Sequence, residues 1–365
     1  MSGSPGAAEG RARGDVSGAR QVWRWARYVV GLGLAALAIW ALTGRRGELS
    51  GATSYLSHLN WGWLTLAVAA ELASLAAFAL VQRRLLAAAG VATTLPFMMW
   101  LTLAATAIAN SMPAGPLVSS VFAYRQYRRR GADEGVAVWT LAAVFVAASI
   151  TLAVVASIGV AVAGAEGSGL DLVGVTIAVL VVALAMGVVF VQRRALAWLV
   201  AATLRGSRRL LHWPAGDLAV QVDRIVSRLT TVRLSPRAII DVTWWGVANW
   251  VLDCGCLALC FLAVGVGIPW KGLLLAYGAG QLAANLPVTP GGLGVVEGSL
   301  TIALVAFGGA ETSTAVAVLL YRIVTFWGEL PIGWVTWAAM TWGTRRDESL
   351  AVDLVDGRDM AEVVA

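Results

Sequence analysis

A long apolar stretch between residues 272 and 308 contains a segment that cannot continue a helix. It reads Asn285-Leu286-Pro287-Val288-Thr289-Pro290-Gly291-Gly292-Leu293-Gly294-Val295-Val296-Glu297. Pro287 and Pro290 each remove a backbone donor, at a cost of roughly 3 kcal/mol in a helix interior, and the glycines do not favour a helix either. In hydrocarbon the freed backbone groups would cost several kcal/mol each. We therefore expect the break to line an interior site rather than to face lipid.

The first half of the chain repeats this device. The segment Asn110-Ser111-Met112-Pro113-Ala114-Gly115-Pro116 follows the apolar run from Leu95 to Ala109, and both breaks carry Pro-x-x-Pro behind an Asn. Paired interruptions in corresponding positions of two halves are typical of a transporter-like binding site. The alternative is that both segments are ordinary loops at helix ends. The distribution of charge argues against that alternative.

Composition places the chain in a membrane. Of its 365 residues, 59% are hydrophobic and only 13% are charged, whereas about a quarter are charged in an average soluble domain. The formal charge of +6 comes from arginines in loops, as the positive-inside rule requires of a polytopic membrane protein. We therefore expect membrane lipids, and no nucleic acid, as partners.

The sequence contains no pattern that indicates soluble-type enzyme chemistry. Cys254, Cys256 and Cys260 share one apolar segment without a second ligand cluster, so they are interpreted as packing residues and not as a zinc site. His58 and His212 stand alone in loops, which leaves no Ser-His-Asp or Cys-His set. We expect no catalytic residues, no metal and no cofactor.

Hydropathy and charge predict an all-α membrane bundle with short terminal tails. Residues 1–22 are predicted to be a disordered cytosolic tail, 23–343 the transmembrane domain and 344–365 a cytosolic C-terminal tail. Within 192–237 lies a basic cytosolic loop whose apolar residues recur at helical spacing. This pattern predicts an amphipathic helix over 218–232, on anionic lipid or against the bundle. Six full spans are expected over residues 28–43, 62–81, 136–163, 170–191, 238–266 and 313–342, the last kinked near Pro331.

The two broken elements, residues 95–130 and 272–308, are predicted to be re-entrant hairpins of opposite direction. If 95–109 crossed the membrane fully, the arginines at 125 and 128–130 would lie outside, and every later loop would change sides with them. The hairpin arrangement leaves only Arg45, Arg46 and Lys271 outside, and both termini in the cytoplasm. One hairpin in each half then makes an inverted repeat.

Five charged residues fall inside the predicted spans or the second hairpin: Glu71, Asp253, Glu297, Arg322 and Glu329. Each would cost about 2.5 to 3.5 kcal/mol if it faced lipid, so they must face the interior, paired or protonated. Glu297 and Arg322 are expected to pair. That pair either holds the hairpin shut or leaves Arg322 as a counter-charge for an anionic ligand. Glu71 and Asp253 are interpreted as neutral acids hydrogen-bonded in the core.

The motif Pro287-x-x-Pro290-Gly291-Gly292-x-Gly294-x-x-Glu297, followed by Arg322 in a long last helix, resembles the transmembrane region of lysylphosphatidylglycerol synthases and its stand-alone bacterial members. The first break, with Arg125 and Gly131 after it, resembles the family's first-half element, although Pro113-Ala114-Gly115-Pro116 departs from the usual Gly-Gly-Glu-like continuation. The resemblance covers residues 28–342.

The resemblance implies an integral protein of the bacterial plasma membrane that binds an anionic phospholipid or moves it between leaflets, without synthesising it. The alternative is a membrane-embedded transferase, or an accessory subunit, that acts on a lipid-linked substrate in cell-envelope biosynthesis. The expected substrate-binding residues are Asn110, Pro113, Pro116, Arg125, Asn285, Pro287, Pro290, Gly291, Gly292, Gly294, Glu297 and Arg322.

Overall fold

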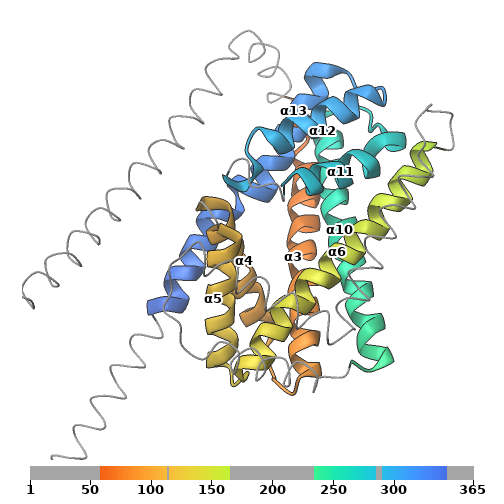
Figure 1. Ribbon diagram of the computed structural model, residues 1–365. Coiled ribbons are helices and arrows are strands. Elements are labelled where there is room, and N and C mark those ends of the chain that lie inside the picture. The colour runs from red at the N-terminus through yellow and green to blue at the C-terminus, as the bar shows by residue number, and fades with distance from the viewer. Residues whose placement is uncertain (1–57, 113–114, 165–233, 285–289, 343–365) are drawn as a thin grey trace, which may run out of the picture. The chain divides into compact units, whose positions relative to one another are not determined.

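The computed structural model describes residues 58–112, 115–164, 234–284 and 290–342, and this part of the chain is helical throughout (Figure 1). The predicted tails, the spans at 28–43 and 170–191 and the amphipathic segment at 218–232 lie outside these ranges. The elements are α3 (Trp61–Ala88), α4 (Leu95–Ser111), α5 (Gly115–Arg129), α6 (Glu134–Gly164), α10 (Pro236–Val264), α11 (Trp270–Ala284), η1 (Pro290–Gly292), α12 (Val295–Ala306), α13 (Glu311–Arg322) and η2 (Ile323–Trp327). Residues 329–342 continue as helix after η2.

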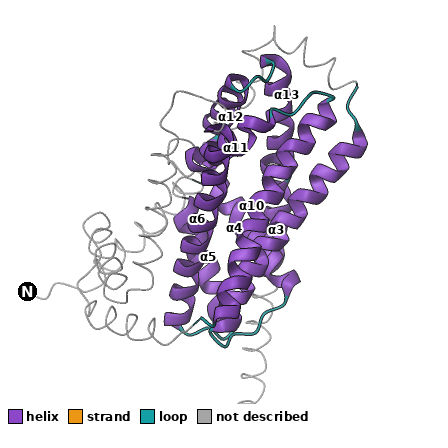
Figure 2. Cartoon of the chain, turned by 90° about the vertical axis from the view of Figure 1, so that its right-hand side faces the viewer, coloured by secondary structure: helices purple, strands orange, loops and turns teal. Residues whose placement is uncertain are grey.

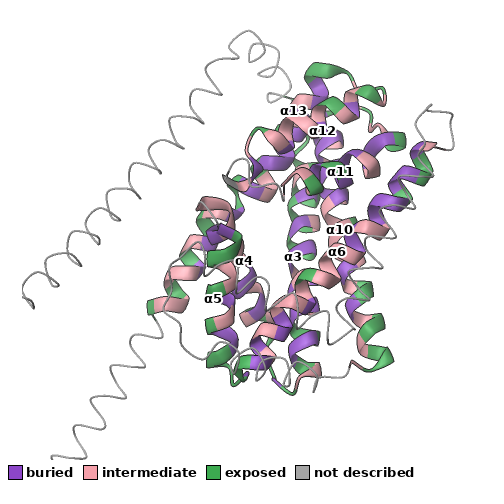
Figure 3. Ribbon diagram, viewed as in Figure 1, coloured by how far each residue is buried: buried purple, intermediate pink, exposed green. Residues whose placement is uncertain are grey.

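Four of the six predicted spans fall in the described residues, and each is a helix long and apolar enough to cross a membrane. They are Trp61–Ala88, Glu134–Gly164, Pro236–Val264 and Glu311–Trp342. Their outer faces carry exposed large apolar side chains, among them Leu72, Phe145 and Ile240, and Figure 3 shows exposed residues along the outside of these helices. Such faces suit contact with lipid tails. The predicted class, a polytopic helical membrane bundle, is confirmed.

The two long helices α3 and α10 run antiparallel and pack along their whole length (Figure 2). At one end the Asn60 amide donates to the Ala263 carbonyl at 2.8 Å, and at the other Arg84 pairs with Asp241 at 3.5 Å. Between these ends the Ser74 hydroxyl donates to the Asn249 carbonyl at 3.0 Å. Because α3 and α10 each precede a broken element, their opposite directions are what an inverted repeat requires.

The first broken element is a hairpin of α4 and α5. Its two helices pack through Met98 and Leu101 on one side and Ala123 and Tyr127 on the other. At the tip, Gly115 lies so close to Ala109 that an added Cβ would be 2.0 Å from the Ala109 carbonyl oxygen. Only glycine fits there. The helix–break–helix arrangement that the sequence predicts is present.

A buried polar chain ties this hairpin to α3. The Gln82 side-chain amide donates to the Thr102 hydroxyl of α4 at 2.8 Å, and the Tyr127 hydroxyl of α5 donates to the Gln82 carbonyl oxygen at 2.7 Å. Both functions of the Gln82 amide are thus satisfied, as a buried amide requires. These two hydrogen bonds therefore fix the position of the hairpin along α3.

The second broken element is a hairpin of α11 and α12 with η1 between them. An added Cβ on Gly280 would lie 2.9 Å from Leu300, and one on Gly272 would lie 2.2 Å from the Phe307 ring, so both ends of the hairpin pack closely. The break itself begins in residues 285–289, which lie outside the described ranges. Gly291, Gly292 and Gly294 then adopt positive φ of 62°, 68° and 81°.

The last span, predicted to be kinked near Pro331, is irregular just before that residue. Residues Ile323–Trp327 form a widened π turn, in which the Gly328 amide donates to the Ile323 carbonyl at 2.8 Å. Pro331 has no N–H to donate to the turn before it, which leaves that turn free to widen. The π turn lies directly after Arg322, and π turns are frequent at functional sites.

Candidate functional site

The two breaks meet inside the bundle. The last turn of α4 packs on η1, and an added Cβ on Gly291 would lie 3.2 Å from the Asn110 carbonyl oxygen and 2.3 Å from the Phe326 ring. Gly291 therefore permits an approach that no other residue allows. Asn110 and Gly291, predicted from separate halves of the chain, therefore lie side by side.

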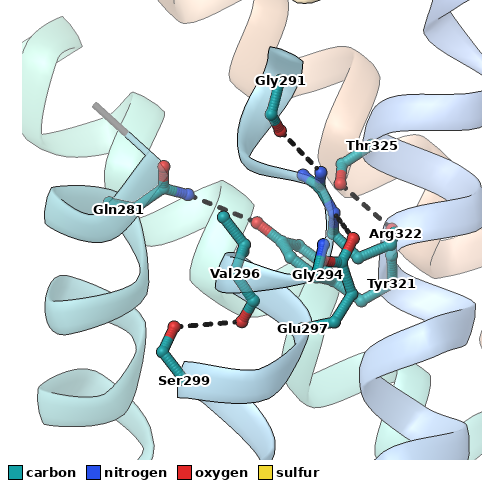
Figure 4. Close-up of polar contacts among 9 residues, drawn as sticks. All are labelled: Gln281, Gly291, Gly294, Val296, Glu297, Ser299, Tyr321, Arg322 and Thr325. Atoms are coloured by element: carbon teal, nitrogen blue, oxygen red, sulfur yellow. Dashed lines mark hydrogen bonds and ion pairs between the residues drawn. The ribbon is translucent and has the colours of Figure 1, made fainter. Parts of the chain in front are cut away.

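Arg322, at the end of α13, lies between the second break and the start of α12. Figure 4 shows its guanidinium between the Gly291 carbonyl and the Glu297 carboxylate. Its Nε donates to Glu297 Oε1 at 2.7 Å and its Nη2 donates to the Gly291 oxygen at 2.9 Å. The side chains of Arg322 and Glu297 are 10% and 24% exposed. The predicted ion pair is therefore present and largely shielded.

Glu297 is positioned by the break that precedes it. It occupies the third position of α12, and its Oε2 accepts a hydrogen bond from the Gly294 amide at 2.7 Å. This return bond satisfies an amide that the helix start leaves without a partner. One carboxylate thus caps α12 with one oxygen and binds Arg322 with the other.

Arg322 keeps hydrogen-bonding capacity beyond these contacts. Of the five N–H groups of a guanidinium, two are used by Glu297 and Gly291, and the remaining three have no partner among the described residues. The guanidinium also stacks on the Phe326 ring, at 4.5 Å from the ring centroid, which holds its plane. A guanidinium presented in this way suits carboxylate or phosphate oxygens.

A polar cluster around Asp253 adjoins this pair. The Tyr277 hydroxyl and the Gln281 amide, both on α11, donate to Asp253 Oδ2 at 2.6 Å and 3.0 Å. The Tyr321 hydroxyl donates to Asp253 Oδ1 at 2.8 Å. The expectation that Asp253 is hydrogen-bonded in the core is confirmed.

Sequence reasoning did not single out Tyr277, Gln281 or Tyr321. Two weak signals were available. Tyr277 and Gln281 are four residues apart on an apolar helix and so share a face, and Tyr321 directly precedes the buried arginine. Neither signal identifies Asp253 as the shared partner, because that contact joins α10 to both α11 and α13.

The other predicted site residues are spread more widely. Gly292 is buried against Ala284 and Val296, and Gly294 contributes the amide that binds Glu297. Pro290 begins η1. Pro113, Asn285 and Pro287 lie outside the described residues.

Pro116 and Arg125 do not approach Arg322 through any described contact. Pro116 is exposed at the start of α5, and Arg125 is exposed farther along the same helix. Ten residues of helix place Arg125 about 15 Å along the axis from Gly115. The first half therefore contributes backbone at Asn110 to the meeting point of the breaks, whereas Arg125 lies on an outer face.

These features define a class: a polytopic helical membrane protein whose two broken hairpins meet at a shielded arginine. The sequence profile of the lysylphosphatidylglycerol synthase transmembrane region matches residues 28–333. The chain belongs to this family. It is also 30% identical over 122 residues to a UPF0104 membrane protein of Methanothermobacter thermautotrophicus, a match that covers 33% of this chain and 34% of that relative.

Proposed function

We propose that this protein binds the anionic head group of a phospholipid at the meeting point of its two breaks and moves that lipid between leaflets. The observation that carries the proposal is Arg322. Its guanidinium is shielded from solvent, held in plane by Phe326 and still has donors without described partners. Phosphate oxygens are the acceptors that such a donor set fits.

The backbone around Arg322 supports the same proposal. The N-terminus of α12 follows the second break and lies next to the guanidinium. It carries a partial positive charge. The Asn110 end of α4 brings the first break to the same place. Broken helices whose ends meet near the bilayer midplane are the usual substrate sites of transporters.

We propose further that the two hairpins are re-entrant, in the plasma membrane of a bacterium, with both chain termini in the cytoplasm. Their helices have 17 and 15 residues in α4 and α5, and 15 and 12 in α11 and α12. A full crossing needs about 20 residues. The basic last turn of α5, with Arg128 and Arg129, suits a cytoplasmic end.

The test is reconstitution of the protein into liposomes with a leaflet-specific assay over a panel of labelled phospholipids and polyprenyl phosphates. We expect faster translocation of anionic lipids than of zwitterionic ones. Arg322→Gln should abolish this difference. Arg237→Gln removes the same charge from an exposed position in the first turn of α10 and should leave it intact.

Other outcomes favour other functions. Head-group turnover without translocation would favour a membrane-embedded transferase, for which the Asp253 cluster would be the first candidate. Normal assembly of the protein with no lipid dependence in either assay would favour an accessory subunit. Equal rates for the wild-type protein and Arg322→Gln would contradict the proposed site.

A further inference from the structure

One carboxyl oxygen of Glu71, on α3, is buried without a hydrogen-bond partner among the described residues. Only 7% of the residue is exposed, and the oxygen without a partner is Oε2. Buried polar groups are hydrogen-bonded in the great majority of cases. This carboxyl group lies in the middle of a membrane-spanning helix. It therefore needs a hydrogen-bond partner that the described residues do not supply.

Glu71 faces two further carboxyl groups. Asp253 lies one helical turn from Asn249, which accepts a hydrogen bond from Ser74, one turn from Glu71 on the antiparallel α3. Glu329 is buried just after η2, which packs on α3, and both acids interact electrostatically with Glu71. An ionised carboxylate can only accept, so contacts among three carboxylates would join acceptor to acceptor and bring like charges together. A proton on one of them converts such a contact into a short, charge-assisted O–H···O hydrogen bond.

The groups around Glu71 do not neutralise it. Asp253 and Cys256 of α10, Tyr321 of α13 and Glu329 of the segment 329–342 interact with Glu71. Tyr277 of α11 acts on Asp253, and Arg322 of α13 acts on Asp253 and Glu329. α4 and α6 place no titratable side chain against Glu71 in the described structure. Of these groups only Arg322 is a cation, and it binds Glu297 and Gly291. The Tyr277 and Tyr321 hydroxyls donate to Asp253.

We propose that Glu71 binds an exchangeable proton, which it shares with Glu329 and Asp253, so that these three residues form a proton site inside the membrane domain. The proton comes from water and returns to water, and no other bond changes.

The proton site adjoins the arginine site but does not depend on it. Tyr321 donates to Asp253 and directly precedes Arg322, and Gln281 approaches the Tyr321 hydroxyl at 3.4 Å. Gain or loss of the proton therefore changes the charge next to the proposed head-group site. The inference goes beyond lipid binding, and it holds whichever ligand Arg322 takes.

The experiment is infrared difference spectroscopy of the purified full-length protein in nanodiscs, taken from neutral to alkaline buffer in ordinary and heavy water. Exposed carboxyl groups are already ionised at neutral pH. We expect the wild-type protein to show a carbonyl band of a protonated carboxyl group that shifts in heavy water and disappears reversibly in alkali. Glu71→Gln should lose the band, whereas Glu311→Gln, at an exposed acid at the start of α13, should keep it.

Glu71→Gln keeps the size of the side chain and can donate to both neighbouring carboxylates, so we expect it to fold. Should it fail to fold, Glu329→Gln tests the same shared proton by changing the other carboxyl group. This variant should diminish or shift the band. The proposal fails if the wild-type protein shows no such band, or if neither variant alters it. It also fails if sodium chloride, but not choline chloride, removes the band at constant pH. None of these measurements involves lipid transport.

Discussion

Arg322 shows how one buried charge is stabilised in this bundle. Its guanidinium meets the Glu297 carboxylate, the Gly291 carbonyl and the face of Phe326. Glu297 in turn accepts from the Gly294 amide. Each contact partly replaces the water that the charges lose, which is what a buried ion pair requires. Both members of the ion pair therefore also bind backbone groups of the break.

We expect Arg322→Met to lower the free energy of unfolding by about 3 to 5 kcal/mol, because it leaves Glu297 charged and without its cation. Glu297→Leu/Arg322→Met removes both charges and should recover most of this loss. Thermal unfolding of the purified variants in detergent measures both.

The transport assay separates structure from function for the same variants. If Arg322 also binds the head group, the double variant folds well and transports nothing. Recovery of transport in the double variant would show that the pair has only a structural role.

At the scale of elements, the bundle depends on glycines where helices or loops come close. An added Cβ on Gly333 would lie 2.3 Å from the Leu103 carbonyl oxygen, so the last span packs directly on the α4 backbone. The Trp334 indole donates to the Ser111 hydroxyl at 3.1 Å next to this contact. The last span and α4 therefore hold the first break against the second.

Gly291 and Gly294 form a matched pair for a test of the second break. Both have positive φ, so alanine at either position costs roughly 1–2 kcal/mol in backbone strain. At Gly294 an added Cβ meets nothing within 4 Å, whereas at Gly291 it lies 2.3 Å from the Phe326 ring. We expect Gly291→Ala to destabilise the protein more than Gly294→Ala, and to weaken anionic-lipid selectivity by displacing the ring under Arg322.

The measurement is again thermal unfolding, together with the liposome assay. Equal losses of stability at the two positions would mean that the Phe326 ring moves aside without destabilising the protein. The close contact at Gly291 would then contribute nothing to the free energy of unfolding.

At the scale of the whole molecule, the order span, hairpin, span occurs in each half of the described chain. α3, the hairpin α4 and α5, and α6 make the first set. α10, the hairpin α11 and α12, and the span Glu311–Trp342 make the second. The antiparallel packing of α3 on α10 turns one set over relative to the other. The two hairpins meet where Asn110 of α4 approaches Gly291 of η1.

This arrangement predicts the sidedness of the loops. We expect a cysteine at Arg128 to be labelled only from the cytoplasmic side and one at Lys271 only from outside, because each lies exposed at the base of a different hairpin. The native cysteines Cys254, Cys256 and Cys260 are buried and should react little. Membrane-impermeant maleimides on intact cells and on inverted vesicles provide the measurement. Outside labelling at Arg128, or at Arg205 in the basic loop, would refute the topology.

The sequence alone determined the membrane class, the four described spans, both helix–break–helix elements and the pairing of Glu297 with Arg322. These features carry strong local signals, because hydrocarbon makes every unpaired charge and every missing backbone hydrogen bond costly. A proline in an apolar run, or an arginine in a span, therefore restricts the possible structures before any tertiary contact is known.

Only the tertiary structure decided which of these features meet. It placed Asn110 against Gly291, gathered Tyr277, Gln281 and Tyr321 around Asp253, and left Arg125 on an exposed helix face. It also showed that the irregular turn of the last span near Pro331 is a π turn at Ile323–Trp327. The physical reason is sequence distance: Ser74 and Asn249 are in contact across 175 residues, and helical periodicity shows which face of a helix is buried but not which helix covers it.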